Sequence, residues 1–246
     1  MKLPKSHPRY KSLATRNLIV KGVEEGITSI HGLIAHGRGE TFDYLIGEKT
    51  NNFAIKSVEA AASQLLLSKH PVISVNGNTA ALVPRELVQL SRLINAPLEI
   101  NIFHSSRKRE LKIKNHLEKH GAKNILLPDK YHKIKFLNSN RRYVNPKGIT
   151  KSDVVFVPLE DGDRTEALIK NGKKVIAVDL NPLSRTAQKA TITVVDNIVR
   201  AMPLLIKKIE QYKKYNKNEL NKIIKYCNNK KTLNEALKYI KKNLAG

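Results

Sequence analysis

Two polar segments of this chain carry residue types that bind charged ligands, and each follows directly on a short apolar run. The run 154–157 leads into Glu160-Asp161-Gly162-Asp163-Arg164, and the run 175–178 leads into Asp179-Leu180-Asn181, with Arg185-Thr186 close behind. Guanidinium groups bind phosphates through paired hydrogen bonds, and carboxylates accept hydrogen bonds from hydroxyl or ammonium groups. A simple connecting turn does not need so many such groups. We therefore predict a ligand site, with solvated turns as the alternative.

A βαβ unit would place both polar segments at one edge of a sheet. Between the two apolar runs lies a helical pattern over 164–170, closed by Asn171-Gly172. A strand, a short helix and a second strand form one unit of a parallel sheet, and ligands bind beyond the carboxyl ends of such strands. We therefore predict an α/β fold, with a Rossmann-like, mostly parallel sheet flanked by helices and further helices at the N-terminus and C-terminus.

Hydrophobic periodicity predicts the remaining elements. Strands are expected at 72–75, 98–103, 124–127 and 191–195, and helices at 52–69, 84–95, 107–120 and 198–212. Ser6-His7-Pro8 resembles a capped helix start, followed by an apolar stripe of Leu13, Val20 and Val23 that ends near Gly26. The polar stretch 128–150, which contains Arg141 and Arg142, is expected to be a long surface loop.

Two further segments place glycines among polar residues, as anion-binding loops do. Asn76-Gly77-Asn78-Thr79 follows strand 72–75 and fits either an anion cradle or a plain turn with a helix cap. The stretch 31–40 has three glycines around Arg38 and is expected to be a loop that approaches a ligand closely. It matches neither the Walker A nor the GxGxxG pattern, so its glycines alone identify no nucleotide site.

The formal charge of +24 in 246 residues permits two kinds of partner. It suits a nucleic-acid-binding protein, and it equally suits an enzyme whose substrates are all anions. The acidic residues of 160–163, together with Asp179 and an aromatic content of 5%, favour the enzyme and argue against a nucleic-acid partner. Residues 207–246 hold twelve Lys against three Glu. We therefore divide the chain into a domain, 1–206, and a Lys/Asn-rich helical tail, 207–246.

Cysteine usage and hydropathy indicate the compartment. Cys227 is the single cysteine and cannot form an internal disulfide, which is typical of reducing surroundings. The first residues carry no apolar signal region, and no apolar run reaches the roughly 18 residues of a membrane helix. We expect a cytoplasmic chain without a membrane partner. The histidines are scattered, and no cluster has the spacing of a protein metal site.

Five motifs together resemble one family. They are PKSHPRY at 4–10, HGRGETFDYLIGEKT at 36–50, PVISVNGNTAALVP at 71–84, DVVFVPLEDGDRTEAL at 153–168 and VIAVDLNPLSRTA at 175–187. Their order and length are similar to those of the archaeal 4-phosphopantoate–β-alanine ligases, also called phosphopantothenate synthetases. The resemblance runs from about residue 4 to 206, and the tail after Lys207 departs from the family pattern.

The resemblance implies a reaction and a set of contacts. ATP, 4-phosphopantoate and β-alanine would give 4-phosphopantothenate, AMP and diphosphate, a step of coenzyme A biosynthesis carried out by a homodimer with a Rossmann-like core. The ATP contacts that it implies are Arg16, Arg38, Asp179, Leu180, Asn181, Arg185, Thr186, Asn197 and Ile198. A Rossmann-like ligase with another substrate remains the alternative, because fold does not fix substrate.

The chemistry of such a ligation suggests roles for individual residues. A carboxylate is a poor electrophile, so adenylation would supply a leaving group before the amine attacks, and Arg38 and Arg185 are the candidate catalytic cations for the phosphates. Asp179 is a candidate for a ribose hydroxyl. Mg²⁺ is expected with ATP, held largely by the substrate phosphates. The remaining candidates, for 4-phosphopantoate and β-alanine, are Asn76, Gly77, Asn78, Thr79, Asp161, Asp163 and Arg164.

Overall fold

The computed structural model describes residues 4–244, and its centre is a six-stranded, all-parallel sheet. The strands of this sheet are β1 (Pro71–Val75), β2 (Leu98–Ile100), β3 (Ile125–Leu126), β6 (Val154–Pro158), β7 (Lys174–Val178) and β8 (Ile192–Val194). Their order across the sheet is β3-β2-β1-β6-β7-β8. This is the doubly wound Rossmann order, whose direction reverses between β1 and β6. The predicted fold class is confirmed.

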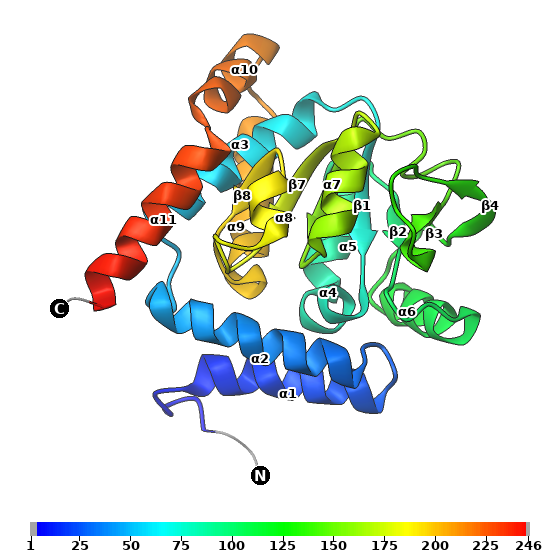
Figure 1. Cartoon of the computed structure of the whole chain (residues 1–246), viewed down its shortest axis with the longest axis horizontal. Helices are drawn as coiled ribbons and strands as arrows, with labels where there is room; N and C mark the ends of the chain where they lie inside the picture. Colours follow the sequence, from blue (N-terminus) through cyan, green and yellow to red (C-terminus); the bar gives the residue numbers. More distant parts are fainter. Residues whose placement is uncertain (1–3, 245–246) are drawn as a thin grey trace.

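Helices cover both faces of the sheet (Figure 1). They are α1 (Tyr10–Glu24), α2 (Ile30–Leu45), α3 (Asn52–Leu67), α4 (Gly77–Leu82), α5 (Pro84–Leu93), α6 (Arg107–Lys119), α7 (Gly162–Lys170), α8 (Arg185–Lys189), α9 (Ile198–Tyr212), α10 (Lys217–Tyr226) and α11 (Asn229–Leu244). Helices α3, α5 and α9 pack on one face, whereas α7 and α8 lie on the other. Helices α1 and α2 run side by side beyond the edge where the strands end (Figure 1).

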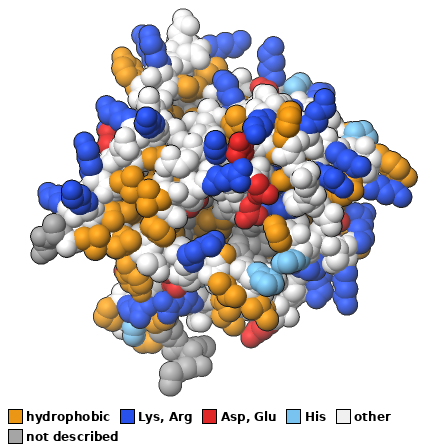
Figure 2. Space-filling model, viewed as in Figure 1, with side chains coloured by type: hydrophobic (Ala, Val, Ile, Leu, Met, Phe, Trp, Pro, Cys, Tyr) orange, Lys and Arg blue, Asp and Glu red, His pale blue; other side chains and the backbone are white. Residues whose placement is uncertain are grey.

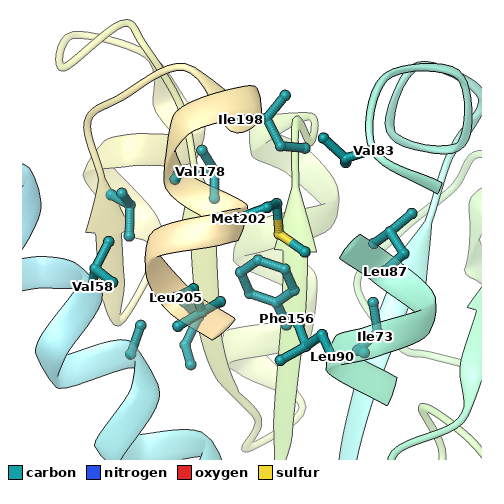
Figure 3. Close-up of a cluster of buried hydrophobic side chains, with 14 of the residues drawn as sticks. Val58, Ile73, Val83, Leu87, Leu90, Phe156, Val178, Ile198, Met202 and Leu205 are labelled. Carbon is teal, nitrogen blue, oxygen red and sulfur yellow. The ribbon is translucent and has the colours of Figure 1, made fainter. Parts of the chain in front are cut away.

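The strands are apolar along their whole length because both of their faces are covered. In β6, Val154 and Phe156 belong to the larger core cluster, while Val155 and Val157 belong to the cluster under α7. Figure 3 shows the larger cluster, in which Phe156 lies beside Met202 of α9. Phe156 is fully buried. Burying such a side chain stabilises the fold by roughly 1.5–3 kcal/mol.

The first helix begins and packs differently from the prediction. Helix α1 starts at Tyr10 rather than at Ser6-His7-Pro8, and its N-cap Arg9 makes no side-chain cap. Its buried residues are Thr15, Ile19 and Gly22, so the expected stripe through Val20 was wrong. Gly22 packs directly against α4, since a Cβ on Gly22 would stand only 2.8 Å from the Cβ of Ala81. Close helix packing therefore decides which face of α1 is buried.

The predicted glycine loop at 31–40 is in fact part of helix α2. Each glycine inside a helix destabilises it by about 1 kcal/mol relative to alanine. Close contacts of the backbone explain one of them: a Cβ on Gly32 would stand 2.2 Å from Asn78 Oδ1 and 2.3 Å from Thr28 Oγ1. Tertiary packing therefore overrides local propensity. Arg38 therefore lies on this helix and not on the expected loop.

The segment 128–150 is not a structureless loop. Strands β4 (Asp129–Lys133) and β5 (Tyr143–Val144) form a small antiparallel sheet, and a 3-10 turn at Asn140–Arg142 precedes β5. The Arg141 side chain is buried beside the end of β2, where its Nε donates to Asn101 Oδ1 at 2.9 Å. The remaining strand boundaries agree closely with expectation, except that β2 ends at Ile100 rather than 103.

The C-terminal residues were predicted to be helical, and they form two helices, α10 and α11, that both pack against α3. Leu220 of α10 and Leu233 of α11 are buried. Helix α9 runs through the expected boundary at 206 and ends at Tyr212. The division into a domain and a tail therefore remains a prediction about independent folding. Among residues 4–244, no helix combines the length and hydropathy of a membrane span.

Candidate active site

A cleft of about 430 Å³ opens at the edge where the parallel strands end. Its walls come from the segments that follow β1, β6, β7 and β8, and from one side of α2. It lies where the strand order reverses, between β1 and β6. Figure 2 shows a hollow on this face with both acidic and basic side chains around it. Open α/β sheets bind their ligands at this position.

Most of the residues that the sequence singled out meet in this cleft. The predicted residues that line it are Arg38, Asn78, Asp161, Asp179, Leu180, Asn181, Arg185, Thr186, Asn197 and Ile198. Arg16, Asn76, Gly77, Thr79, Asp163 and Arg164 do not line it. The hydrogen bonds and ion pairs of each segment explain which side chains face the cleft and which do not.

The segment after β1 is a helix start, tied to its neighbours. Asn76 Oδ1 accepts from the Thr79 amide at 3.0 Å, and its Nδ2 donates to the Leu159 carbonyl at 2.7 Å. Asn78 Nδ2 donates to the Gly32 carbonyl of α2 at 2.9 Å. Gly77 is required because a Cβ there would stand 2.6 Å from the Ile27 carbonyl oxygen. The Asn76 side chain thus joins the ends of β1 and β6. Among residues 76–79, Asn78 is the one that lines the cleft.

Below the cleft lies a buried network of charges. Glu160 is 1% exposed and forms ion pairs with Arg141 and with the fully buried Arg164. Burial opposes ionisation of Glu160, but the two guanidinium groups outweigh it and hold its pKa below the usual value. Removing one partner of such a network costs about 3–5 kcal/mol, because a buried charge is left uncompensated. Arg164 therefore lies within the protein and does not face the cleft.

Asp161 is the carboxylate at the rim of this network. Its Oδ2 accepts from Arg141 Nη1 at 2.7 Å, and 52% of its side chain is exposed. Desolvation and the neighbouring Glu160 carboxylate raise its pKa above the usual value, against the pull of Arg141. Arg141 thus fixes the position of a half-exposed acid beside the cleft. Asp163, in contrast, is exposed in the first turn of α7 and does not line the cleft.

The segment after β7 carries Asp179, which faces the cleft. Asp179 accepts from the Asn181 amide at 2.9 Å and from the Ser184 hydroxyl. Burial raises its pKa, opposed by the Ser184 hydrogen bond. Thr186 Oγ1 donates to the Glu160 carbonyl at 2.7 Å, which ties this segment to the end of β6. Gly162 allows that approach, since a Cβ there would stand 2.4 Å from Arg185 Cβ.

Arginines of three elements surround the cleft, and two of them are held by carboxylates. Arg16 Nε donates to both oxygens of Glu40 at 2.8 Å, and Glu40 rather than Arg16 lines the cleft. Arg185 Nη2 donates to Glu166 at 2.6 Å, with 60% of its side chain exposed. Arg38 is exposed and, within residues 4–244, has no ion-pair partner.

The N-terminus of α9 completes the cleft. Asn197 caps the helix by accepting from the Val199 amide at 3.2 Å, and its Nδ2 donates to Asp43 at 2.7 Å. Asp43 and Asp196 are both paired with Arg200. A helix N-terminus attracts anions through its free amide groups and dipole. Asn197 and Ile198 line the cleft at this end.

The sequence reasoning did not include every residue that lines the cleft. His36, Glu40, Phe42 and Ser184 line the cleft without having been predicted. The first three lie on α2 at helical spacing, so reading 31–40 as a helix would have placed them on the face that carries Arg38 and Gly39. Burial lowers the pKa of His36, whose Nε2 is buried and has no hydrogen-bond partner among the described residues.

The sheet order and the position of the cleft define this chain as a Rossmann-like ligand-binding protein with a polar, cation-rimmed site. Comparison with known proteins specifies it further. The family model for phosphopantothenate/pantothenate synthetase matches residues 53–243. The chain belongs to this family.

Relatives named 4-phosphopantoate–beta-alanine ligase align over nearly the whole chain. The protein from Thermococcus onnurineus is 52% identical, over 99% of this chain and 94% of the relative. The proteins from Methanosarcina mazei and Methanospirillum hungatei are 48% and 43% identical, each over 98% of this chain and over 95% and 98% of their own lengths. Because the family match reaches residue 243, residues 207–243 belong to the family pattern, and the expected end of the resemblance at 206 was wrong.

Proposed function

We propose that this chain joins 4-phosphopantoate to β-alanine at the expense of ATP, giving 4-phosphopantothenate, AMP and diphosphate in coenzyme A biosynthesis. The observation that carries the proposal is the convergence, in one cleft at the strand-order reversal, of residues from four strand ends with the cations of α2 and α8. The names of relatives that are 43–52% identical support the choice of substrates.

ATP fits the residues that line the cleft. Asp179 offers a carboxylate for a ribose hydroxyl, and Asn181 and Thr186 stand beside it. Arg38, Arg185 and the N-terminus of α9 supply positive charge for the phosphates. Arg16 lies one layer behind, held by Glu40, and would reach the nucleotide after a change of partner. These assignments extend the family resemblance and are the basis of the tests below.

The ligation would run through an acyl-adenylate. An oxygen of the 4-phosphopantoate carboxylate would attack the α-phosphorus, diphosphate would leave, and the amine of β-alanine would then displace AMP from the activated carbonyl. The cleft contributes cations that stabilise charge on the phosphorus oxygens. Holding two reactants in place contributes roughly 7–11 kcal/mol at best. Arg38, the cleft-lining cation on α2 without an ion pair in residues 4–244, is the main candidate for that role.

The second and third substrates have candidate positions too. Asn78 is the cleft-facing member of the group proposed for the substrate's own phosphate, and Asp161 suits the ammonium group of β-alanine. Mg²⁺ would be held largely by nucleotide phosphates, with Asp161 as the candidate protein ligand, because its side chain is half exposed at the cleft although Oδ2 is paired with Arg141. It would neutralise phosphate charge when bound.

Two further features belong to the proposal. The protein would act as a homodimer, as the resemblance implies. It would act in the cytoplasm, where ATP is abundant. Thiols stay reduced in that compartment, which suits the free Cys227. The direct test is nucleotide turnover with each substrate left out in turn. AMP that forms only when both 4-phosphopantoate and β-alanine are present would support the ligase, whereas no turnover would contradict it.

A further inference from the structure

A second cavity, of about 420 Å³, adjoins the cleft and has no role in the contacts proposed so far. The two share His36, Glu40 and Asn197, so they meet at the N-terminus of α9. The far wall of the second cavity is the N-terminal segment, in which the sequence showed the motif PKSHPRY at 4–10. The lining residues from that wall are Lys5, His7, Pro8, Arg9, Tyr10, Lys11 and Ser12.

This cavity has a surplus of positive charge. Lys5, Arg9 and Lys11 have no ion-pair partner within residues 4–244. The acids that also line it are mostly engaged: Asp43 is paired with Arg200, and Glu40 is paired with Arg16. Glu48 is the lining acid without an ion pair in the described chain. The balance favours an anion in the cavity.

Arg9 is held in position for such a ligand. Its Nη2 donates to the Tyr44 hydroxyl at 2.7 Å, and its guanidinium carbon lies 5.9 Å from the centre of the Tyr44 ring. Its amide donates to His7 Nδ1 at 3.0 Å, which fixes the turn before α1. The guanidinium makes no other hydrogen bond to residues 4–244. A fixed guanidinium with free N–H groups binds phosphate with little loss of conformational entropy.

The N-terminus of α9, which lies between the two cavities, also favours an anion there. Helix α9 has 15 residues, and its cap Asn197 borders both cavities. The amide of Ile198 has no hydrogen bond to the described residues, in contrast to that of Val199. A phosphate chain that starts in the cleft and passes this helix end would enter the second cavity.

We propose that the segment 5–11 forms the subsite for the β- and γ-phosphates of ATP, and for the diphosphate that leaves. This inference rests on the proposed function. When a carboxylate oxygen of 4-phosphopantoate bonds to the α-phosphorus, the bond from that phosphorus to the bridging oxygen breaks, and its electron pair stays on the diphosphate. Arg9 and Lys11, with Lys5, would neutralise the charge that the leaving group gains.

The test compares nucleotides that differ only in these phosphates. Binding of ATP, AMP and inorganic diphosphate is measured by calorimetry for the full chain and for the double variant Arg9→Ala/Lys11→Ala. Both side chains are exposed, so the variant should fold, and an unchanged Tm checks this. The matched control is Lys222→Ala/Lys225→Ala on α10, which removes the same charge from exposed positions far from the cleft (Figure 1).

We expect Arg9→Ala/Lys11→Ala to weaken ATP and diphosphate binding by about tenfold or more, with AMP binding unchanged. The control should leave all three unchanged. Equal loss of AMP and ATP binding, unchanged ATP binding, or an equal effect in the control would overturn the subsite. A wild-type chain that binds neither nucleotide would overturn the proposed function and the subsite together. If the wild type binds the nucleotides normally and the double variant binds them equally well, the subsite is contradicted but the proposed function is not.

Discussion

Arg185 donates both Nε and Nη2 to a single oxygen of Glu166, at 3.2 and 2.6 Å. The Arg185 hydrogen bonds, followed by that of Lys170, lower the pKa of Glu166 to about 2. The carboxylate therefore stays ionised at neutral pH and holds the guanidinium at the rim of the cleft. The two hydrogen bonds to Glu166 leave three N–H donors of the Arg185 guanidinium available to a ligand.

Removing that cation should weaken ATP binding. We expect Arg185→Ala to raise the Kd for ATP by about 10- to 100-fold, the effect of losing one or two charge-assisted hydrogen bonds. Lys189→Ala is the matched control, because Lys189 lies 3.8 Å from the same Glu166 but does not line the cleft. Calorimetric titration of both variants decides the matter. An equal loss in the two would mean that general charge, rather than the position of Arg185, is responsible.

Asp179→Asn should act mainly on the KM for ATP. The amide can still accept from the Asn181 amide, as the carboxylate does at 2.9 Å, so the segment should keep its shape. A charged hydrogen bond to a ribose hydroxyl would become a neutral one, and we expect KM to rise about tenfold with kcat little changed. Steady-state kinetics with an unchanged Tm would support the ribose contact. A fall in kcat at constant KM would count against it.

The buried Glu99 makes stability depend on pH. Glu99 is fully buried and accepts from the amides of Asn145 and Ile149, at 2.9 and 2.6 Å. Burial raises its pKa to about 7 from an ordinary 4.5. Because the folded chain keeps a proton that the unfolded chain releases, its stabilising contribution is complete below about pH 4.5 and is lost as pH rises through 7.

The consequence is measurable with one variant. Between about pH 4.5 and 8 the wild type should lose on the order of 3 kcal/mol of unfolding free energy through Glu99. Glu99→Gln cannot titrate, so its stability curve should be flatter over that window, whatever constant offset the amide adds. Urea unfolding at several pH values gives both curves. Parallel curves would show that Glu99 is ionised throughout.

The C-terminal helices should matter for stability, through Asn229 in particular. Its Nδ2 donates to the carbonyls of Ala187 and Ala190, at 2.8 and 3.1 Å, and its Oδ1 accepts from the Thr193 amide at 2.7 Å. These bonds complete the end of α8 and the edge strand β8. We expect Asn229→Ala to cost about 2–3 kcal/mol of unfolding free energy, because buried partners are left unsatisfied.

The matched control for this prediction is Asn221→Ala, an exposed position on α10, which should change stability by less than about 0.5 kcal/mol. Urea unfolding measures both variants. A cost for Asn229→Ala no greater than the control would mean that α11 contributes little to the stability of the sheet. The chain cut after Tyr212, which loses α10 and α11, could then keep its fold, as the predicted division of the chain requires.

The sheet was predictable from the sequence because its strands are short, fully buried apolar runs bounded by turns. The βαβ unit at 154–178 and the helix cap at Asn197 both follow from local patterns. Helix α2 was not predictable in that way, since the close packing of its Gly32 involves residues distant in the chain, such as Asn78. Local composition pointed to a loop, and packing decided otherwise.

The site was predictable only in part, for the same reason. Polar residues that follow strands were found from their position alone, and ten of the proposed residues do line the cleft. Whether a polar side chain faces a ligand or the protein depends on its partners. Arg164 follows Asp163 in the chain and Arg141 follows Asn140, yet both are buried around Glu160. No spacing rule distinguishes such arginines from Arg38, which is exposed on α2.

The most direct test of the proposed ligase is ATP turnover with 4-phosphopantoate and β-alanine, with AMP and ADP quantified separately. We expect AMP and diphosphate in equal amounts, only when both substrates are present, and no turnover by a folded Arg38→Ala variant. ADP in place of AMP would contradict the adenylate route. The absence of any nucleotide turnover would contradict the proposed function itself.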